Sequence, residues 1–220
     1  MRNCLRGLIL LMLGLQGLST GWAQSAPRAV VTPPPKTVPS TAAFNFTPTV
    51  VDMDFDGYLA KVVVFKDGTV KRQVGLPSGW KAAGSSGELY LTNPLFPDGR
   101  ITLRMSSLEP PVKFDDGWIE TTRPLILGGL PKDSKEQKIV NVTPNALNLQ
   151  GWNSIDFKVS FDRLGRRFST GWMFILLPDK RFLEVVYSAP DEKFTQVRAA
   201  ATEMLKGWEL HVVIGKTPAH

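Results

Sequence analysis

Apolar and polar residues alternate along much of the chain, with the period of two that is typical of β-strands. In residues 50–55, large apolar residues occupy one side and aspartates the other. Asp56-Gly57 follows as a turn, and Asp67-Gly68 separates the apolar run 62–65 from its return at 70–74. Because Asp-Gly between β-forming runs is a strong hairpin signal, we expect successive hairpins here.

A further hairpin is predicted in the middle of the chain. Residues 88–92 and 101–105 are rich in β-forming residues, and they flank the Pro/Gly-containing segment 93–100, which we expect to be a loop. Residues 110–150 are rich in turn formers and carry no clear period, so they predict no definite element.

Three strands are predicted in the C-terminal half. Residues 155–161 alternate strictly and indicate a half-buried strand. Residues 171–177 are apolar on both faces, which favours a central strand covered on both sides. Residues 182–187 have a similar composition and follow after a turn at 178–180.

One long helix is predicted near the end of the chain, because apolar residues recur there at spacings of three, four and seven. The members of this stripe are Phe194, Val197, Ala201, Met204, Leu205 and Trp208. We expect Ser188 or Asp191 to cap its start and Gly207 to end it, with a short strand at 210–214. The expected fold is α+β: an antiparallel β-sheet with a long C-terminal helix packed on it.

The first 23 residues have the three parts of a secretory signal peptide. Arg2 and Arg6 provide a positive start, an apolar run of about a dozen residues follows, and Gly21-Trp22-Ala23 matches a cleavage site. The apolar run is shorter than the roughly 20 residues of a membrane span. We therefore expect a signal peptide at 1–23, a Pro-rich linker at 24–43, one domain at 44–220, and no transmembrane span after cleavage.

Cleavage after Ala23 changes the composition. It removes Cys4, the only cysteine, and the loss of Arg2 and Arg6 lowers the net charge from +6 to +4. A mild basic excess favours anionic surfaces but is no nucleic-acid signature. The chain has two histidines, His211 and His220, too few for a histidine zinc site and a poor basis for a Ser-His-acid triad.

Two ends of the domain resemble the PsbP-like superfamily. These are Leu76-Pro77-Ser78-Gly79-Trp80 after a hairpin, and the junction from the strand 182–187 through Ser188-Ala189-Pro190 into the helix that ends at Leu205-Lys206-Gly207-Trp208. The resemblance implies an α/β/α sandwich, no common enzyme activity and no catalytic residues. The family would also place a helix in the middle of the chain, but the segment from Arg123-Pro124-Leu125 to Gln137 shows no clear helical pattern.

Three groups of residues are candidates for binding. Alternating Asp52, Asp54 and Asp56 before Gly57 match the start of a calcium loop, although the twelfth position is Val63 and not Glu; an exposed strand face is the alternative. Three arginines around Gly165 could bind phosphate or an acidic surface, or could form a solvated hairpin tip. Trp118 and Trp152 follow glycines and could stack on sugars from exposed positions. The three arginines are Arg163, Arg166 and Arg167.

Carboxylates provide the remaining route to catalysis. Glu184 lies in an apolar strand, where a buried carboxylate needs a partner or a raised pKa, and Asp115-Asp116 could pair with it for glycoside chemistry. Our first hypothesis is nevertheless a non-catalytic accessory protein, periplasmic or secreted and without a required cofactor, that binds a protein or an anionic envelope component. A small carboxylate-dependent envelope hydrolase and a calcium- or glycan-binding module stay open as alternatives.

Overall fold

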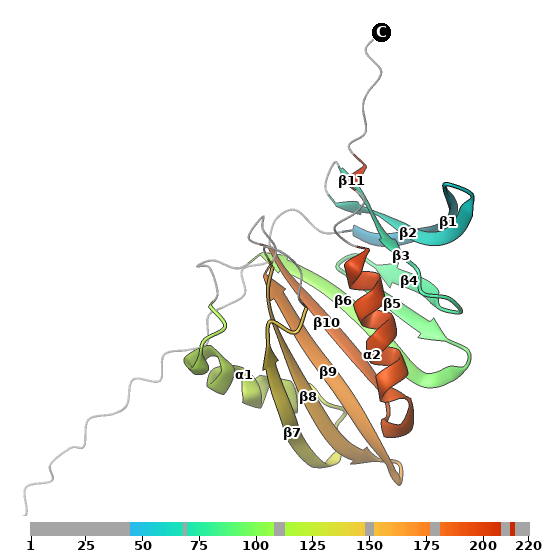
Figure 1. Ribbon diagram of the computed structural model, residues 1–220. Helices are drawn as coiled ribbons and strands as arrows, with labels where there is room; N and C mark the ends of the chain where they lie inside the picture. Colours follow the sequence, from blue (N-terminus) through green and yellow to red (C-terminus); the bar gives the residue numbers. More distant parts are fainter. Residues whose placement is uncertain are drawn as a thin grey trace, which may run out of the picture. The chain divides into compact units, whose positions relative to one another are not determined.

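Two antiparallel β-sheets form the framework of the protein (Figure 1). The computed structural model describes residues 45–67, 70–107, 113–147, 152–176, 181–207 and 212–213. The small sheet has the strand order β1-β2-β3-β11 and the large sheet the order β4-β5-β6-β10-β9-β8-β7. The strands of the small sheet are β1 (Asn45–Phe55), β2 (Tyr58–Asp67), β3 (Val70–Gly75) and β11 (Val212–Val213). Those of the large sheet are β4 (Lys81–Ser85), β5 (Glu88–Asn93), β6 (Phe96–Ser107), β7 (Lys135–Pro144), β8 (Asn153–Arg163), β9 (Arg166–Leu176) and β10 (Arg181–Pro190).

Two helices lie on opposite faces of the large sheet. Successive strand residues point to opposite faces, and along β10 Leu183 packs in a core cluster with helix α2 (Asp191–Lys206), whereas Phe182 packs in a second cluster with helix α1 (Asp116–Gly128). Helix α2 contacts β10, β6, β9 and also β3 of the small sheet. The α+β class and the sandwich architecture predicted from the sequence are confirmed.

The hairpins and the C-terminal helix follow the predicted pattern closely. β1 pairs with β2, β2 with β3 and β5 with β6, all antiparallel. The buried residues of α2 are the predicted stripe, joined by Ala200, within the described part of the helix. The predicted cap is wrong: Pro190 occupies the N-cap, and Asp191 accepts a hydrogen bond from Ser169 Oγ at 2.6 Å. Gly207 is the C-cap, as predicted.

The middle of the chain differs from the sequence prediction. Helix α1 occupies residues 116–128 although Pro124 lies inside it, and β7 follows as the exposed edge strand of the large sheet. The helix that the family resemblance implied is therefore present. β6 begins at Phe96, so only two residues separate it from β5 and the predicted loop at 93–100 is wrong.

β8 was predicted to be half-buried, but most of its residues are buried. Its apolar face packs in the cluster that contains α1, and Asp156 on the other face contacts Arg198 of α2. Several predicted features lie outside the described residues: the signal peptide and linker, the turns at 68 and 178–180, Trp208, His211 and His220. Within the described ranges, neither helix is long and apolar enough to cross a membrane.

Candidate functional site

The three aspartates of the predicted calcium loop lie on the β1–β2 hairpin. Asp52 forms an ion pair with Lys61 at 2.7 Å, and Asp54 accepts the backbone N–H of Gly57 at 2.6 Å. Asp56 takes a positive φ of 53° in the turn. Over the described residues, no group of three or more acidic, histidine or cysteine side chains is placed to hold a metal. Calcium binding stays a prediction, and a melting-temperature shift at millimolar calcium is its test.

The three arginines lie at the β8–β9 hairpin, and each is bonded to a carboxylate of the same chain. Arg163 pairs with Asp133, Arg166 with Asp98 and Glu192, and Arg167 with Asp162. The hydrogen bond from Arg163 holds the pKa of Asp133 below its ordinary value. An incoming anion would therefore compete with these carboxylates, although every pair is largely exposed and so weak.

The two candidate tryptophans are placed differently from each other. Trp152 is 8% exposed and belongs to the core cluster beneath α2. Trp118 is half-buried in α1, where its ring meets the edge of Phe174 at a centroid distance of 5.2 Å. The ring of Trp152 is thus largely unavailable for stacking on a sugar, whereas Trp118 keeps part of its surface open.

The candidate carboxylates for hydrolysis have structural partners. Glu184 accepts a hydrogen bond from Trp172 Nε1 at 2.7 Å and lies 3.9 Å from an Arg104 nitrogen. Asp115 is the N-cap of α1 and accepts the backbone N–H of Trp118. Glu184 and Asp115 therefore each have a local role, and Asp116 lies in the first turn of α1, where the helix dipole favours a carboxylate.

A buried polar cluster lies between β8, β10 and α2. Tyr187 donates its hydroxyl to Asp156 Oδ2 at 2.6 Å, and Arg198 approaches the same oxygen at 3.3 Å. Asp156 is 4% exposed, and its Oδ1 has no hydrogen-bond partner among the described atoms. Burial raises the pKa of Asp156, although Tyr187 and Arg198 both oppose that shift. Burial, followed by the nearby carboxylate, raises the pKa of Tyr187, which therefore stays a hydrogen-bond donor.

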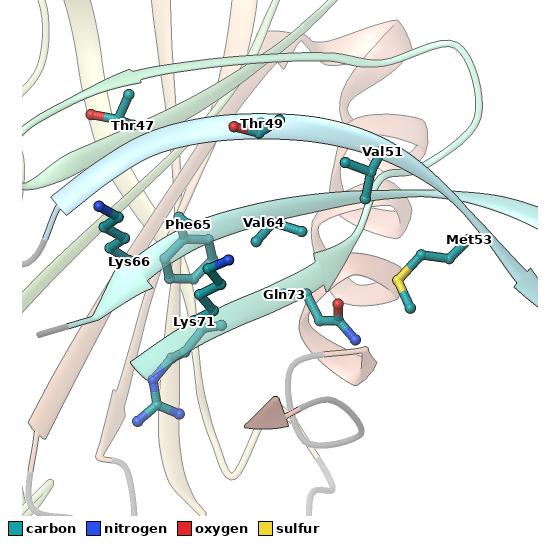
Figure 2. Close-up of a pocket in the computed structure, with 10 residues that line it drawn as sticks. Thr47, Thr49, Val51, Met53, Val64, Phe65, Lys66, Lys71 and Gln73 are labelled. Carbon is teal, nitrogen blue, oxygen red and sulfur yellow. The ribbon is translucent and has the colours of Figure 1, made fainter. Parts of the chain in front are cut away.

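The pocket of greatest interest lies on the small sheet and has a volume of about 650 Å³ (Figure 2). β1, β2 and β3 form it, and its position follows from their register. Val64 of β2 pairs with Thr49 of β1 on one side and with Gln73 of β3 on the other. Two residues further along β2, Lys66 pairs with Lys71 of β3. Because side chains alternate between the faces of a sheet, all five point to the same face. The lining residues are Thr47, Thr49, Val51, Met53, Val64, Phe65, Lys66, Lys71, Arg72 and Gln73.

The pocket is cationic at one end and apolar at the other. Figure 2 shows Lys66 and Lys71 at one end and Val51 and Met53 at the opposite end. Like charges opposite each other on neighbouring strands are destabilising, and neither lysine has an ion-pair partner within the part of the chain that the structure describes. The arrangement is thus suited to an anion that neutralises both ammonium groups.

Gln73 is the buried polar group of the pocket wall. Its side chain is 5% exposed and lines the pocket. Among the described residues, the buried side-chain atoms without a hydrogen-bond partner are Ser134 Oγ and Asp156 Oδ1, so the Gln73 amide is not an orphaned group. Gln73 adds a polar side chain to the pocket wall between the lysines and the apolar end.

Sequence reasoning did not find this pocket or the Asp156 cluster. A partial signal existed for the first: Lys66 and Lys71 lie on either side of the predicted Asp67-Gly68 turn. They are opposite each other because Asp67 pairs with Val70, a register that the Asp-Gly signal alone does not give. No comparable signal existed for Asp156, because it alternates with apolar residues like a solvent-facing position.

No protein-family model matches this chain, and no curated protein matches it. Several solved structures have a similar fold, among them the three that follow. Cyanobacterial PsbP (CyanoP) from Synechocystis is 10% identical, covers 73% of this chain and 97% of its own, and has a TM-score of 0.44. LpqN of Mycobacterium tuberculosis, which is involved in cell envelope biogenesis, is 14% identical over 71% of this chain and 87% of its own, with a TM-score of 0.37. The Ran-binding protein Mog1p of Saccharomyces cerevisiae is 14% identical over 76% of this chain and 97% of its own, with a TM-score of 0.37. The superfamily resemblance predicted from the sequence agrees with these matches, which are similar to this chain in fold alone.

Proposed function

We propose that this protein is an exported, non-catalytic accessory protein of the cell envelope that acts by binding an anionic partner. The observation that carries the proposal is the composition of the pocket on the small sheet. Its described lining contains two lysines and an arginine beside apolar and hydroxyl side chains, and it includes neither a carboxylate nor an imidazole. Such a lining supplies affinity for an anion but no carboxylate pair for glycoside hydrolysis.

The charge of the pocket can be tested by retention on envelope fragments. We expect Lys66→Gln/Lys71→Gln to weaken retention strongly, because it removes both ammonium groups of the pocket. The matched control is Lys135→Gln/Lys138→Gln, which removes two exposed lysines from β7 on the other sheet and changes the net charge equally. Equal loss in both variants would mean that only net charge matters and would contradict the proposal.

The arginine hairpin provides a second comparison in the same assay. Replacing Arg163, Arg166 and Arg167 with glutamine should leave retention close to wild type if binding resides in the pocket. A larger loss here than in the lysine variant would move the binding site to the β8–β9 hairpin, as the sequence hypothesis first suggested.

Export is tested separately by the N-terminus of the mature protein. We expect sequencing of protein recovered from the periplasm or culture medium to begin at Gln24. Recovery of a chain that begins at Met1 from the cytoplasm would contradict the exported location.

A further inference from the structure

The pocket on the small sheet combines two surfaces that a simple anion site does not need. The cationic end is built from Lys66 and Lys71, a directly opposed pair at the close of the β2–β3 hairpin. The far end is built from Val51 and Met53, which are half-buried and line the same pocket. An inorganic anion would use the first surface and leave the second in water.

The register of the strands fixes the distance between the two ends. From Lys66 to Ala60, which pairs with Met53, the chain runs six residues along β2. At about 3.3 Å per residue this spans roughly 20 Å, close to the length of an extended long-chain fatty acid. The middle of this path is lined by Val64, which is half-buried, and by the buried side chain of Gln73.

We propose that this pocket binds a single-chain anionic amphiphile, with its carboxylate or phosphate head between Lys66 and Lys71 and its aliphatic chain along Val64, Val51 and Met53. The proposal deepens the proposed function, on which it rests, by giving the chemical class of the ligand. Lysine ammonium groups act as compact point charges that accept either head group. The apolar end of the pocket shields the aliphatic chain of the ligand from water, as in most small-molecule pockets.

Chain length provides the first test, by isothermal titration of the purified protein with alkyl carboxylates and alkyl phosphates below their micelle concentrations. Each methylene that enters the apolar end should tighten binding about threefold to fourfold. The gain should stop once the chain reaches the Met53 end. Binding of inorganic phosphate as tight as that of dodecyl phosphate would overturn the proposal, because the apolar end would then contribute nothing.

Head-group charge provides the second test. Dodecanoate and dodecyl phosphate should bind, whereas dodecyltrimethylammonium, with the same chain and the opposite charge, should bind at least about tenfold more weakly. Lys66→Gln/Lys71→Gln should weaken dodecanoate binding by about 10- to 100-fold, while Lys135→Gln/Lys138→Gln leaves it unchanged. Equal affinity for the cationic and anionic amphiphiles would show non-specific adsorption and overturn the proposal.

A blocking variant locates the site. Thr49 is exposed and lines the pocket, so Thr49→Trp should fill it without disturbing the core, and dodecanoate binding should be lost while the melting temperature is retained. Undiminished binding would place the amphiphile elsewhere. If Thr49→Trp loses both binding and the fold, the Lys66→Gln/Lys71→Gln variant decides instead, because both lysine side chains are exposed and can be changed without cost to packing.

The outcomes separate this inference from the proposed function. If amphiphiles fail to bind but the Lys66/Lys71 variant still loses retention on envelope fragments, the ligand class is wrong and the pocket's binding role stands. If anionic phospholipid vesicles retain the protein through the same lysines while free amphiphiles do not bind, a bilayer surface is the partner and the single-chain proposal is overturned. If amphiphiles do not bind and the Lys66/Lys71 variant keeps wild-type retention on envelope fragments, both proposals fail.

Discussion

The Tyr187–Asp156 hydrogen bond gives a quantitative test of the interior. The donor and acceptor are both almost fully buried and lie 2.6 Å apart, and Asp156 Oδ2 has one other contact, Arg198 at 3.3 Å. Tyr187→Phe removes the hydroxyl and leaves a buried carboxylate with a single long ion contact. Because a hydrogen bond to a charged group contributes about 1.5–3 kcal/mol, we expect the free energy of unfolding to fall by that amount.

The assay is urea unfolding followed by tryptophan fluorescence, with thermal melting as a second measurement. For a chain of this length, about 1 kcal/mol corresponds to roughly 2–4 °C in melting temperature, so the expected fall is several degrees. Tyr58→Phe is the matched control, because it deletes the same hydroxyl from a residue that is 72% exposed. That variant should unfold like the wild type.

A double-mutant cycle shows whether the loss comes from this bond. In an Asp156→Ala background the Tyr187 hydroxyl has lost its acceptor, so removing it should cost little or even stabilise the protein. If Tyr187→Phe costs the same in both backgrounds, within about 0.5 kcal/mol, the bond carries none of the effect and the reasoning is refuted.

Three further predictions follow from the same region and from the surface. A Cβ at Gly171 would overlap the Tyr187 ring, so Gly171→Ala should lower the free energy of unfolding by about 1–3 kcal/mol in urea; no change would mean that the ring is not seated over Gly171. Burial raises the pKa of Asp156 in the folded chain above its ordinary value. The folded chain therefore holds this proton at a higher pH than the unfolded chain, and the contribution of Asp156 to stability should increase as the pH falls from above the raised pKa toward the ordinary one. Asp156→Asn should lack this component in urea titrations across pH, and identical slopes for the two proteins would contradict it. Arg166→Gln breaks two exposed ion pairs, and we expect an unchanged melting temperature since such pairs are weak; a drop of several degrees would be evidence against this.

The parts of the fold that the sequence predicted are those with strong local signals. Asp56-Gly57 forces a turn, and the following residues alternate clearly, so the β1–β2 hairpin could be placed from short-range patterns alone. The stripe of α2 spans its full length, and its apolar side meets the large sheet as the spacing requires.

Helix α1 lacks such a signal for a physical reason. Among its residues, Thr122 and Ile126 are the fully buried ones, so there is no long apolar stripe to read. Pro124 also discourages a helix from sequence alone. Partial burial of Trp118 and Ile119 against β8 and β9 provides the stabilisation that propensity does not.

The candidate sites were harder to predict because each depends on pairing between distant segments. Arg163 and Asp133 lie 30 residues apart, and Arg166 and Asp98 lie 68 apart, so the neutralisation of the arginine hairpin could not be seen in the local sequence. Asp156 lies on the polar side of a strand that was predicted to be half-buried, but Arg198 of α2 contacts it from that side.

The pairing of β11 with β3 has a consequence for the order of folding. Val212 and Val213 add the last strand to a sheet whose other strands lie between residues 45 and 75. The outer edge of β3 therefore gains its backbone hydrogen bonds only when residues about 140 positions apart have met. Such distant pairing makes folding slow and leaves a bare strand edge in the meantime. Until β11 has been synthesised, the chain therefore exposes an unpaired β3 edge with which other chains could pair, and a chaperone would be most useful in that interval.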